Sequence, residues 1–283
     1  MILVTGATGQ LGQLVIQSLL KKVPANQIIA AVRNPQKAQG LKDLGVQVRV
    51  ADYNNPESWS AALTGVDKLL LISANEVGSR LKQHKTVIDA AKKYGKLKLI
   101  AYTSILRADT SNLVLAEEHK ATEQMIKDSG IPYSFLRNGW YTENYTMSAK
   151  SAVEHGAVFG AVKDGRISSA ARQDYAEAAA KVMTMEKPKA IYELAGDTSY
   201  SLTELAAEIA KQSGKSVKYN NLPEADYKAF LTKVGLPEGF AGVLAQSDAA
   251  AAVGGLYHEG HELSELIGRK TTPLADVVKV SLK

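Results

Sequence analysis

The sequence contains no cysteine. This absence excludes disulfide bonds, thiolate catalysis, cysteine-ligated zinc and iron–sulfur clusters, and it fits a reducing compartment. The basic residues form no runs and are not interleaved with aromatic residues, so no nucleic-acid groove is expected. All apolar runs are too short to span a membrane. The first residues lead directly into a strand pattern without a basic segment or cleavage site, so we expect no signal peptide and a cytoplasmic location.

What the sequence does contain is the composition of an ordinary globular protein. Of its 283 residues, 45% are hydrophobic and 22% are charged, which is sufficient for a large core without covalent staples. The length suggests one large domain or two smaller ones. The net charge of +5 is spread along the chain. A diffuse positive field of this kind suits an anionic ligand, such as a phosphorylated cofactor.

Short apolar runs alternate with stretches of helical period through the first half of the chain, and several of the runs are apolar throughout. This alternation predicts an α/β fold with a doubly wound parallel sheet, the Rossmann fold, covered by helices on both faces. The predicted strands are Met1–Thr5, Ile28–Val32, Val46–Val50, Lys68–Ile72, Lys98–Tyr102, one ending at Phe135–Leu136, and Ile191–Leu194. The predicted helices are Leu11–Leu19, Gln36–Leu44, Pro56–Leu63, Arg80–Tyr94 and Leu202–Gln212.

The alternation loosens after Arg137. We therefore predict a dinucleotide-binding domain over residues 1–137, to which about 170–197 returns, and a smaller, partly helical substrate domain over residues 138–283. Ser201 is the expected N-cap of the last predicted helix. The region after that helix is rich in glycine in places and has no clear period, so we expect it to be irregular.

Three glycines recur at steps of three between the first strand and the first helix. Gly6 would allow the turn off the strand, Gly9 would let the backbone approach a pyrophosphate, and Gly12 would let the helix pack close to the strand. A plain turn would also fit such spacing, but the strand–turn–helix context favours a nucleotide on the helix N-terminus. The predicted contacts are Gly6, Ala7, Thr8, Gly9, Gln10, Leu11 and Gly12.

The end of the second predicted strand indicates which dinucleotide binds. NAD sites place a carboxylate there to hold the ribose hydroxyls, whereas this chain has Arg33. A guanidinium suits a 2′-phosphate and offers nothing specific to a bare hydroxyl. A solvated surface arginine is the alternative. The pattern favours NADP(H) over NAD(H).

Together with Ala101–Ser104, these features resemble the short-chain dehydrogenase/reductase superfamily, most members of which carry Tyr-x-x-x-Lys after the fifth strand. Here that spacing occurs as Tyr94 and Lys98, before the strand and hence at the edge opposite to the ligand edge. We interpret this pair as a helix end and a strand start. The expected place holds His119 and Glu123 instead. His119 is either a weak acid or a histidine on a helix surface, so no catalytic acid is assigned.

This departure, with the segment Phe135–Tyr145, resembles the atypical NmrA-like branch of the superfamily along nearly the whole chain. Within it the chain is most similar to bacterial NADPH:quinone oxidoreductases and, more distantly, to triphenylmethane reductases. The resemblance implies that the nicotinamide end of the cofactor is held by two segments. These are Ser73, Ala74 and Asn75, and Asn138, Gly139, Trp140, Tyr141, Thr142 and Glu143.

A missing tyrosine acid fits a quinone acceptor, because a reduced quinone oxygen is a much weaker base than an alkoxide. We therefore expect direct hydride transfer from NADP(H) to a quinone or a similar aromatic acceptor, without flavin or metal. Trp140, Tyr141 and Tyr145 offer flat surfaces for aligning the acceptor, although core packing would also explain Trp140.

A dye reductase and a non-catalytic NADP(H)-sensing regulatory protein are the alternative functions. Homodimer formation is left open. His258–Glu262 lacks zinc-site spacing.

Overall fold

The structure is a computed structural model that describes all 283 residues, and the chain forms two compact units. We call them the sheet unit and the C-terminal unit. The chain passes from one unit to the other after Ala108, Ala116, Asn138, Asp174 and Glu193. The sheet unit contains Met1–Ala108, Glu117–Asn138 and Tyr175–Glu193, and the C-terminal unit contains Asp109–Ala116, Gly139–Asp174 and Leu194–Lys283.

The predicted doubly wound sheet is confirmed. Seven strands are ordered β3-β2-β1-β4-β5-β6-β8, and the pairs from β3 to β6 are parallel. The order reverses direction between β1 and β4, which is where open α/β sheets bind ligands at the carboxyl ends of their strands. The strands are β1 (Ile2–Val4), β2 (Ile28–Val32), β3 (Gln47–Val50), β4 (Lys68–Leu71), β5 (Leu99–Ile105), β6 (Tyr133–Asn138) and β8 (Ile191–Leu194).

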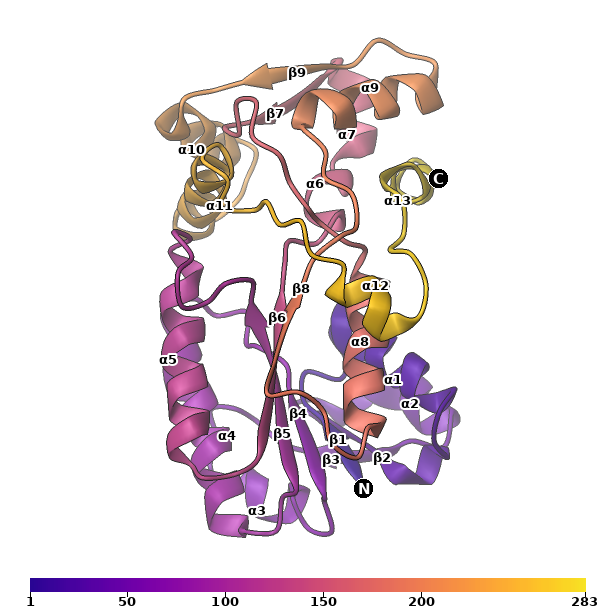
Figure 1. The fold of residues 1–283 in the computed structure, drawn as a ribbon, viewed down its shortest axis with the longest axis vertical. Coiled ribbons are helices and arrows are strands. Elements are labelled where there is room, and N and C mark those ends of the chain that lie inside the picture. The colour runs from indigo at the N-terminus through magenta and orange to yellow at the C-terminus, as the bar shows by residue number, and fades with distance from the viewer. The chain divides into compact units, whose positions relative to one another are not determined.

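Helices cover both faces of this sheet, which explains why β2 and β5 are buried at every residue (Figure 1). On one face Trp59, Val87 and Ile126 pack into the same hydrophobic core as the strands. That face carries α3 (Ser58–Ala62), α4 (Arg80–Tyr94) and α5 (Leu115–Asp128), and the other carries α1 (Gln10–Leu20), α2 (Gln39–Asp43) and α8 (Arg172–Thr184).

The C-terminal unit combines helices with a two-stranded parallel sheet of β7 and β9. Ser201 is the N-cap of α9, as predicted. Its hydroxyl accepts from the N–H of Glu204, whose carboxylate accepts from the N–H of Ser201. The elements are α6 (Glu143–Thr146), α7 (Ala149–His155), β7 (Ala157–Gly160), α9 (Leu202–Ser213), β9 (Lys218–Asn221), α10 (Glu224–Lys233), α11 (Glu238–Ala251), α12 (Glu262–Ile267) and α13 (Leu274–Ser281).

The expectation of an irregular region after α9 is wrong, because four helices follow β9. Three of them, α10, α11 and α13, have Pro223, Pro237 and Pro273 as N-caps, and none has a side-chain cap. The usual start signal of Ser, Thr, Asp or Asn is therefore missing. Proline instead fixes φ before the first turn and blocks further extension toward the N-terminus.

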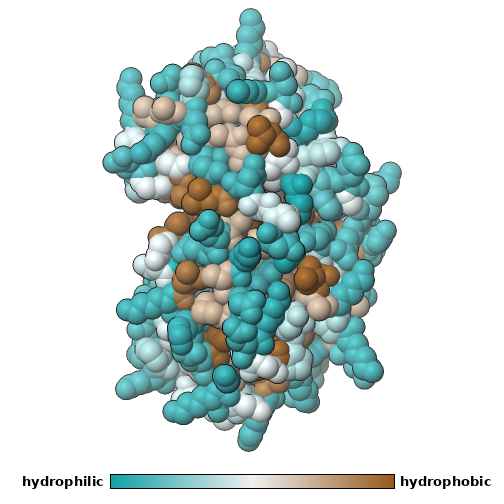
Figure 2. All heavy atoms as spheres, turned by 60° about the vertical axis from the view of Figure 1, so that its left-hand side comes forward, coloured by the Kyte–Doolittle hydropathy of each residue, from teal (hydrophilic) through white to brown (hydrophobic).

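The face seen in Figure 2 is mostly hydrophilic, with hydrophobic side chains in small groups. The most exposed of the large apolar side chains are those of Met147, Val253 and Val280, which lie in the C-terminal unit. None of the helices is both long and apolar enough to span a bilayer.

Candidate functional site

The glycine loop between β1 and α1 adopts the geometry that its spacing predicts. Gly6 has a φ of +57°, a left-handed conformation that favours glycine. Its carbonyl accepts from the N–H of Gly9 at 2.9 Å and closes the turn. A Cβ on Gly12 would lie 2.3 Å from the Gly6 oxygen, so no side chain fits there without moving the loop. The close packing at Gly12 is therefore between the helix and the loop itself.

The N-terminus of α1 is open to an anion. Gly9 is the N-cap and provides no side chain to the first N–H groups, and the first turn contains no acidic residue. Unpaired N–H groups and the helix dipole make such an end attractive to phosphate. The Gln13 amide donates to the Thr8 carbonyl at 2.8 Å, which fixes the loop beside the helix.

Arg33 directly follows β2 and is 67% exposed. Its guanidinium lies 3.7 Å from the carboxylate of Glu76, which is also more than half exposed. An exposed ion pair at this distance contributes little to stability. The guanidinium can therefore exchange this partner for a phosphate at low cost.

The chain that leaves β4 is anchored residue by residue to neighbouring elements. The N–H of Ile72 donates to Thr5 Oγ1 at 2.8 Å, and its carbonyl accepts from the Tyr53 hydroxyl at 2.8 Å. The N–H of Ser73 donates to Thr103 Oγ1 at 2.9 Å. The segment Ser73–Asn75, which the resemblance assigns to the nicotinamide end, is thus a fixed surface in the sheet unit.

Asn138 ends β6 at the same carboxyl edge and is only 6% exposed. Its side-chain oxygen Oδ1 is buried and has no hydrogen-bond partner in the protein. Leaving a buried amide oxygen unpaired costs free energy, so such an atom calls for an explanation. A ligand N–H group would satisfy it.

The residues directly after Asn138 belong to the C-terminal unit. Trp140 and Thr142 pair with Ala170 in a short ladder: the Ala170 N–H donates to the Trp140 carbonyl at 3.1 Å, and the Thr142 N–H donates to the Ala170 carbonyl at 3.0 Å. The Arg172 guanidinium lies 4.8 Å from the centre of the Tyr141 ring. The carboxylate of Glu143 accepts from the N–H of Arg172 at 2.9 Å. Both aromatic side chains are half-buried.

Known proteins share this fold along its full length. Residues 1–277 match the NmrA-like family. This chain belongs to that family. It is 58% identical over 279 residues to quinone oxidoreductase 2 of Escherichia coli (strain K12), with 98% of this chain and 97% of that protein covered.

Two solved structures extend the comparison for this NmrA-like chain. The NADPH-dependent quinone oxidoreductase from Escherichia coli, complexed with NADPH, has 57% identity and a TM-score of 0.97, with 100% of both chains covered. The triphenylmethane reductase of Citrobacter sp., complexed with NADP(H), has 43% identity and a TM-score of 0.95, again with 100% of both chains covered.

In this member of the NmrA-like family His119 is an interior residue, contrary to a position on a helix surface. It is 6% exposed, and its Nδ1 lies 2.7 Å from the Tyr102 hydroxyl. Burial, followed by the nearby Arg80 charge, lowers the pKa of His119 well below its usual range. The imidazole is therefore neutral at physiological pH, which does not suit a proton donor.

Tyr145 is also an interior residue, buried in the C-terminal unit. Its hydroxyl donates to Asp248 Oδ1 at 2.8 Å, and burial raises the pKa of the hydroxyl well above its usual value. With its polar atom paired and its ring buried, Tyr145 offers no flat surface to a ligand. We therefore assign it to the packing of this unit.

Tyr94 and Lys98 lie where the sequence places them. Tyr94 is the last residue of α4, and Lys98 precedes β5 at the amino edge of the sheet. The Lys98 ammonium binds Asp67 Oδ1 at 2.7 Å while remaining 73% exposed. This contact is a surface ion pair, remote in the fold from the carboxyl edge that carries the glycine loop.

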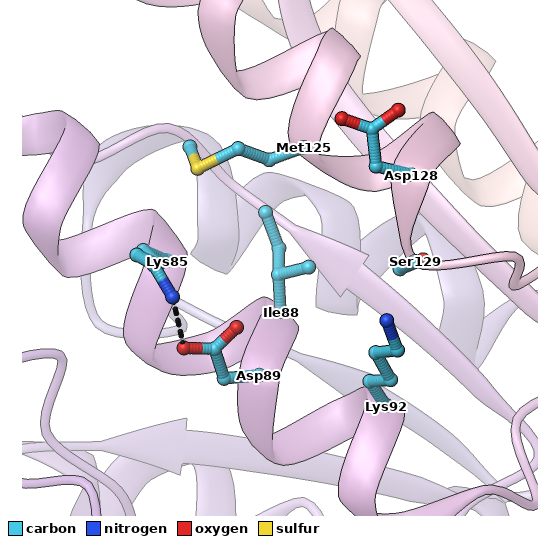
Figure 3. A pocket seen from close by; sticks show the side chains of 7 residues that line it. All are labelled: Lys85, Ile88, Asp89, Lys92, Met125, Asp128 and Ser129. Atoms are coloured by element: carbon cyan, nitrogen blue, oxygen red, sulfur yellow. Dashed lines mark hydrogen bonds and ion pairs between the residues drawn. The ribbon is translucent and has the colours of Figure 1, made fainter.

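A small cavity of about 160 Å³ lies elsewhere in the sheet unit, between α4 and the end of α5 (Figure 3). Met125 and Ile88 face each other across it, and Lys85 is paired with Asp89 on its wall. Because α4 runs back from the carboxyl edge, this cavity lies toward the amino edge and does not belong to the nucleotide site. Its lining is Lys85, Ile88, Asp89, Lys92, Met125, Asp128 and Ser129.

Sequence reasoning missed the side chains that anchor the segment after β4, among them Thr5 and Thr103. Polar residues at the carboxyl ends of buried strands are the signal that could have identified them, since such residues need partners. Which backbone group each one meets depends on the strand order. That order is not apparent from either residue alone.

Proposed function

We propose that this chain is an NADPH-dependent quinone oxidoreductase that transfers a hydride directly to the quinone without flavin. The observation that carries the proposal is the 58% identity over nearly the full length to the Escherichia coli quinone oxidoreductase. The glycine loop and Arg33 support NADPH as the donor. We further propose that the acceptor is a quinone and that the protein acts in the cytoplasm.

The adenine half of the cofactor belongs to the loop and the end of β2. The pyrophosphate sits on the open N-terminus of α1, with Gly9 allowing close approach. Arg33 binds the 2′-phosphate in place of Glu76, since a guanidinium matches the geometry of a phosphate. The contacts assigned here are Gly6, Ala7, Thr8, Gly9, Gln10, Leu11, Gly12 and Arg33.

The nicotinamide half belongs to Ser73–Asn75 and to the segment that starts at Asn138. The unpaired Asn138 Oδ1 is the acceptor for a carboxamide N–H, which explains why it is buried without a partner in the protein. Trp140 and Tyr141 bound the acceptor ring and hold it flat for transfer. Gly139, Thr142 and Glu143 fix the backbone of that segment.

When bound, NADPH supplies the hydride. The quinone takes up this hydride and one proton and leaves as the hydroquinone, and the cofactor leaves as NADP⁺. Hydride addition leaves a phenolate-like oxygen, which is a much weaker base than an alkoxide, and water can deliver its proton. The residues assigned here therefore align and shield the reactants. His119 and Tyr145 receive no role, because both are buried and paired.

The test is NADPH oxidation, followed by the loss of nicotinamide absorbance, with a small benzoquinone and protein shown to be free of flavin by its visible spectrum. We expect turnover that depends on quinone and is not raised by added flavin. Turnover only after flavin is added would contradict direct transfer. Binding of NADPH without reduction of any quinone, dye or aldehyde would point to the sensor alternative.

A triphenylmethane dye is a second candidate acceptor, favoured by the 43% identity to the Citrobacter reductase. The same assay with such a dye separates the two acceptors by their kcat/KM values. Gel filtration of the purified chain tests homodimer formation, which the sequence leaves open.

A further inference from the structure

The backbone of one residue in the sheet unit is held at both its N–H and its carbonyl by side chains of α4. The N–H of Ala74 donates to His84 Nε2 at 2.9 Å, and its carbonyl accepts from Arg80 Nε at 2.7 Å. Ala74 is the central residue of the segment Ser73–Asn75. The N–H groups of Ile72 and Ser73 donate to threonine hydroxyls, whereas the backbone of Ala74 is bound by an imidazole and a guanidinium.

The contacts of His84 fix its protonation. Because Nε2 accepts from Ala74, the ring proton must reside on Nδ1, which lies 3.0 Å from Thr122 Oγ1. The Thr122 hydroxyl donates its own hydrogen bond to the Glu118 carbonyl at 2.8 Å, so it accepts from His84 Nδ1. His84 is fully buried, and burial lowers its pKa to about 3. The imidazole thus remains neutral and remains an acceptor.

Arg80 is also paired with a residue of α5. It is 6% exposed, and its guanidinium lies 3.4 Å from Glu118 Oε2. The other oxygen of Glu118 accepts from the N–H of Gly78 at 3.0 Å, so the loop after Asn75 is tied to α5 as well. Burying a charged pair costs free energy, and apolar packing would stabilise a core more simply. The contacts of His84 and Arg80 with the Ala74 backbone, which we call the clamp, therefore indicate that the position of this residue matters.

We infer that His84 and Arg80 are positioning residues, which hold the Ala74 backbone so that Ser73–Asn75 meets the nicotinamide end of NADPH in one fixed geometry. This inference rests on the proposed function. It predicts that loss of the clamp affects the nicotinamide end and hydride transfer while the adenine end, bound by the glycine loop, is unaffected. Near-attack geometry is sensitive to small displacements of such a surface.

The experiment compares two ligands in each variant. NADPH and 2′-phosphoadenosine diphosphate ribose share every group except the nicotinamide, and their affinities are measured by fluorescence or calorimetric titration. In His84→Phe we expect NADPH to bind about tenfold more weakly, as expected for one lost hydrogen bond, and kcat to fall further still. The affinity for the truncated ligand should stay within about twofold.

His84→Gln restores an acceptor near the position of Nε2, so it should recover most of the NADPH affinity and kcat. Thr122→Val leaves the Ala74 contact in place but removes the partner of Nδ1, and it should give a smaller loss of the same kind. It also serves if His84→Phe does not fold. Ser134→Ala is the control, since it removes a buried hydroxyl of the sheet unit that donates to the Lys189 carbonyl at 2.8 Å and contacts neither Ala74 nor His84. Both ligands should bind to it normally.

Equal losses for the two ligands, or no loss for either, would overturn the inference and leave His84 as a packing residue. So would a His84→Gln variant as impaired as His84→Phe. A wild-type protein that reduces no quinone would instead refute the proposed function. The ligand comparison would still test the clamp, because it requires binding and no turnover.

Discussion

Arg33 lies 3.7 Å from Glu76 in a pair whose side chains are 67% and 51% exposed. Such a contact leaves the guanidinium available for a stronger anion. We predict that Arg33→Ala weakens NADPH binding by about 2 kcal/mol, the scale of a charge-assisted hydrogen bond to phosphate. NADH, which lacks the phosphate, should bind nearly unchanged. Titration of both cofactors measures the difference.

Glu76→Gln is the control for this assignment. It removes the negative charge near Arg33 and retains an amide that can still contact Gln83, the second partner of Glu76. NADPH should bind to it at least as tightly as to the wild type. Equal losses of NADPH and NADH in Arg33→Ala would show that Arg33 does not read the 2′-phosphate.

Tyr94 and Lys98 carry the spacing of a catalytic pair but lie at the amino edge of the sheet. We predict that Tyr94→Phe and Lys98→Met keep kcat for a quinone within about threefold, less than the tenfold that corresponds to roughly 1.4 kcal/mol of barrier. Steady-state kinetics beside circular dichroism test this. A hundredfold fall in a folded variant would place chemistry at this edge.

Sequence reasoning succeeded for residues whose role is set by local backbone needs. Gly6 and Gly12 were predictable because a left-handed turn and a close helix contact accept only glycine. It failed for His84 and His119, whose partners come from other elements. His119 lies on a helix, and only the packing of α5 against β5 turns it toward Tyr102.

At the scale of elements, the strands of the sheet were predictable because their cores are apolar throughout. The predicted end of β5 at Tyr102 is too early, since the strand runs to Ile105. Thr103 and Ser104 are buried there, and the Ser104 hydroxyl donates to Glu123 Oε1 at 2.6 Å. Buried polar residues continue a strand when they are satisfied, which depends on a distant residue.

Asp248 in α11 makes the stability of the C-terminal unit depend on pH. Its carboxylate is 3% exposed and accepts from the N–H of Ala161 at 2.9 Å and from the Tyr145 hydroxyl. Burial raises the pKa of Asp248 to about 6, despite the opposing effect of these two hydrogen bonds. The folded state therefore binds more protons than the unfolded state between about pH 4 and pH 6.

It follows that this group stabilises the fold as pH falls from 7 toward 5, and that the contribution is lost as pH rises through about 6. We predict that the free energy of unfolding of the wild type, relative to Asp248→Asn, rises by about 1 kcal/mol over that interval. Asparagine can keep both contacts, one through its oxygen and one through its amide N–H. Urea titrations at the two pH values measure the change.

The comparison isolates Asp248 because the buried histidines remain in both proteins. His84 and His119 have lowered pKa values and act with the opposite sign, since the unfolded state gains their protons as pH falls. Asp226→Asn, an exposed carboxylate on α10, is the matched control and should not alter the pH dependence. An unchanged profile in Asp248→Asn would contradict the assignment.

For the whole molecule, the doubly wound class was predictable from alternation alone, and the change of unit between Asn138 and Gly139 lies where that alternation loosens. A return over about residues 170–197 was predicted, and in the structure α8 begins in the C-terminal unit and continues in the sheet unit from Tyr175. The short excursion Asp109–Ala116 has no signal in the sequence. Its backbone is set by distant partners: the N–H of Val114 donates to Gln246 Oε1 at 3.0 Å.

Direct hydride transfer makes a kinetic demand on the whole molecule, because donor and acceptor must be bound at the same time. A flavin carrier would instead be reduced by NADPH and reoxidised by quinone in separate steps, which gives ping-pong kinetics. We predict that double-reciprocal plots at several fixed quinone concentrations intersect. NADPH deuterated at the transferred position should also slow turnover wherever transfer limits the rate. Parallel plots with flavin in the purified protein would contradict direct transfer, whatever the acceptor.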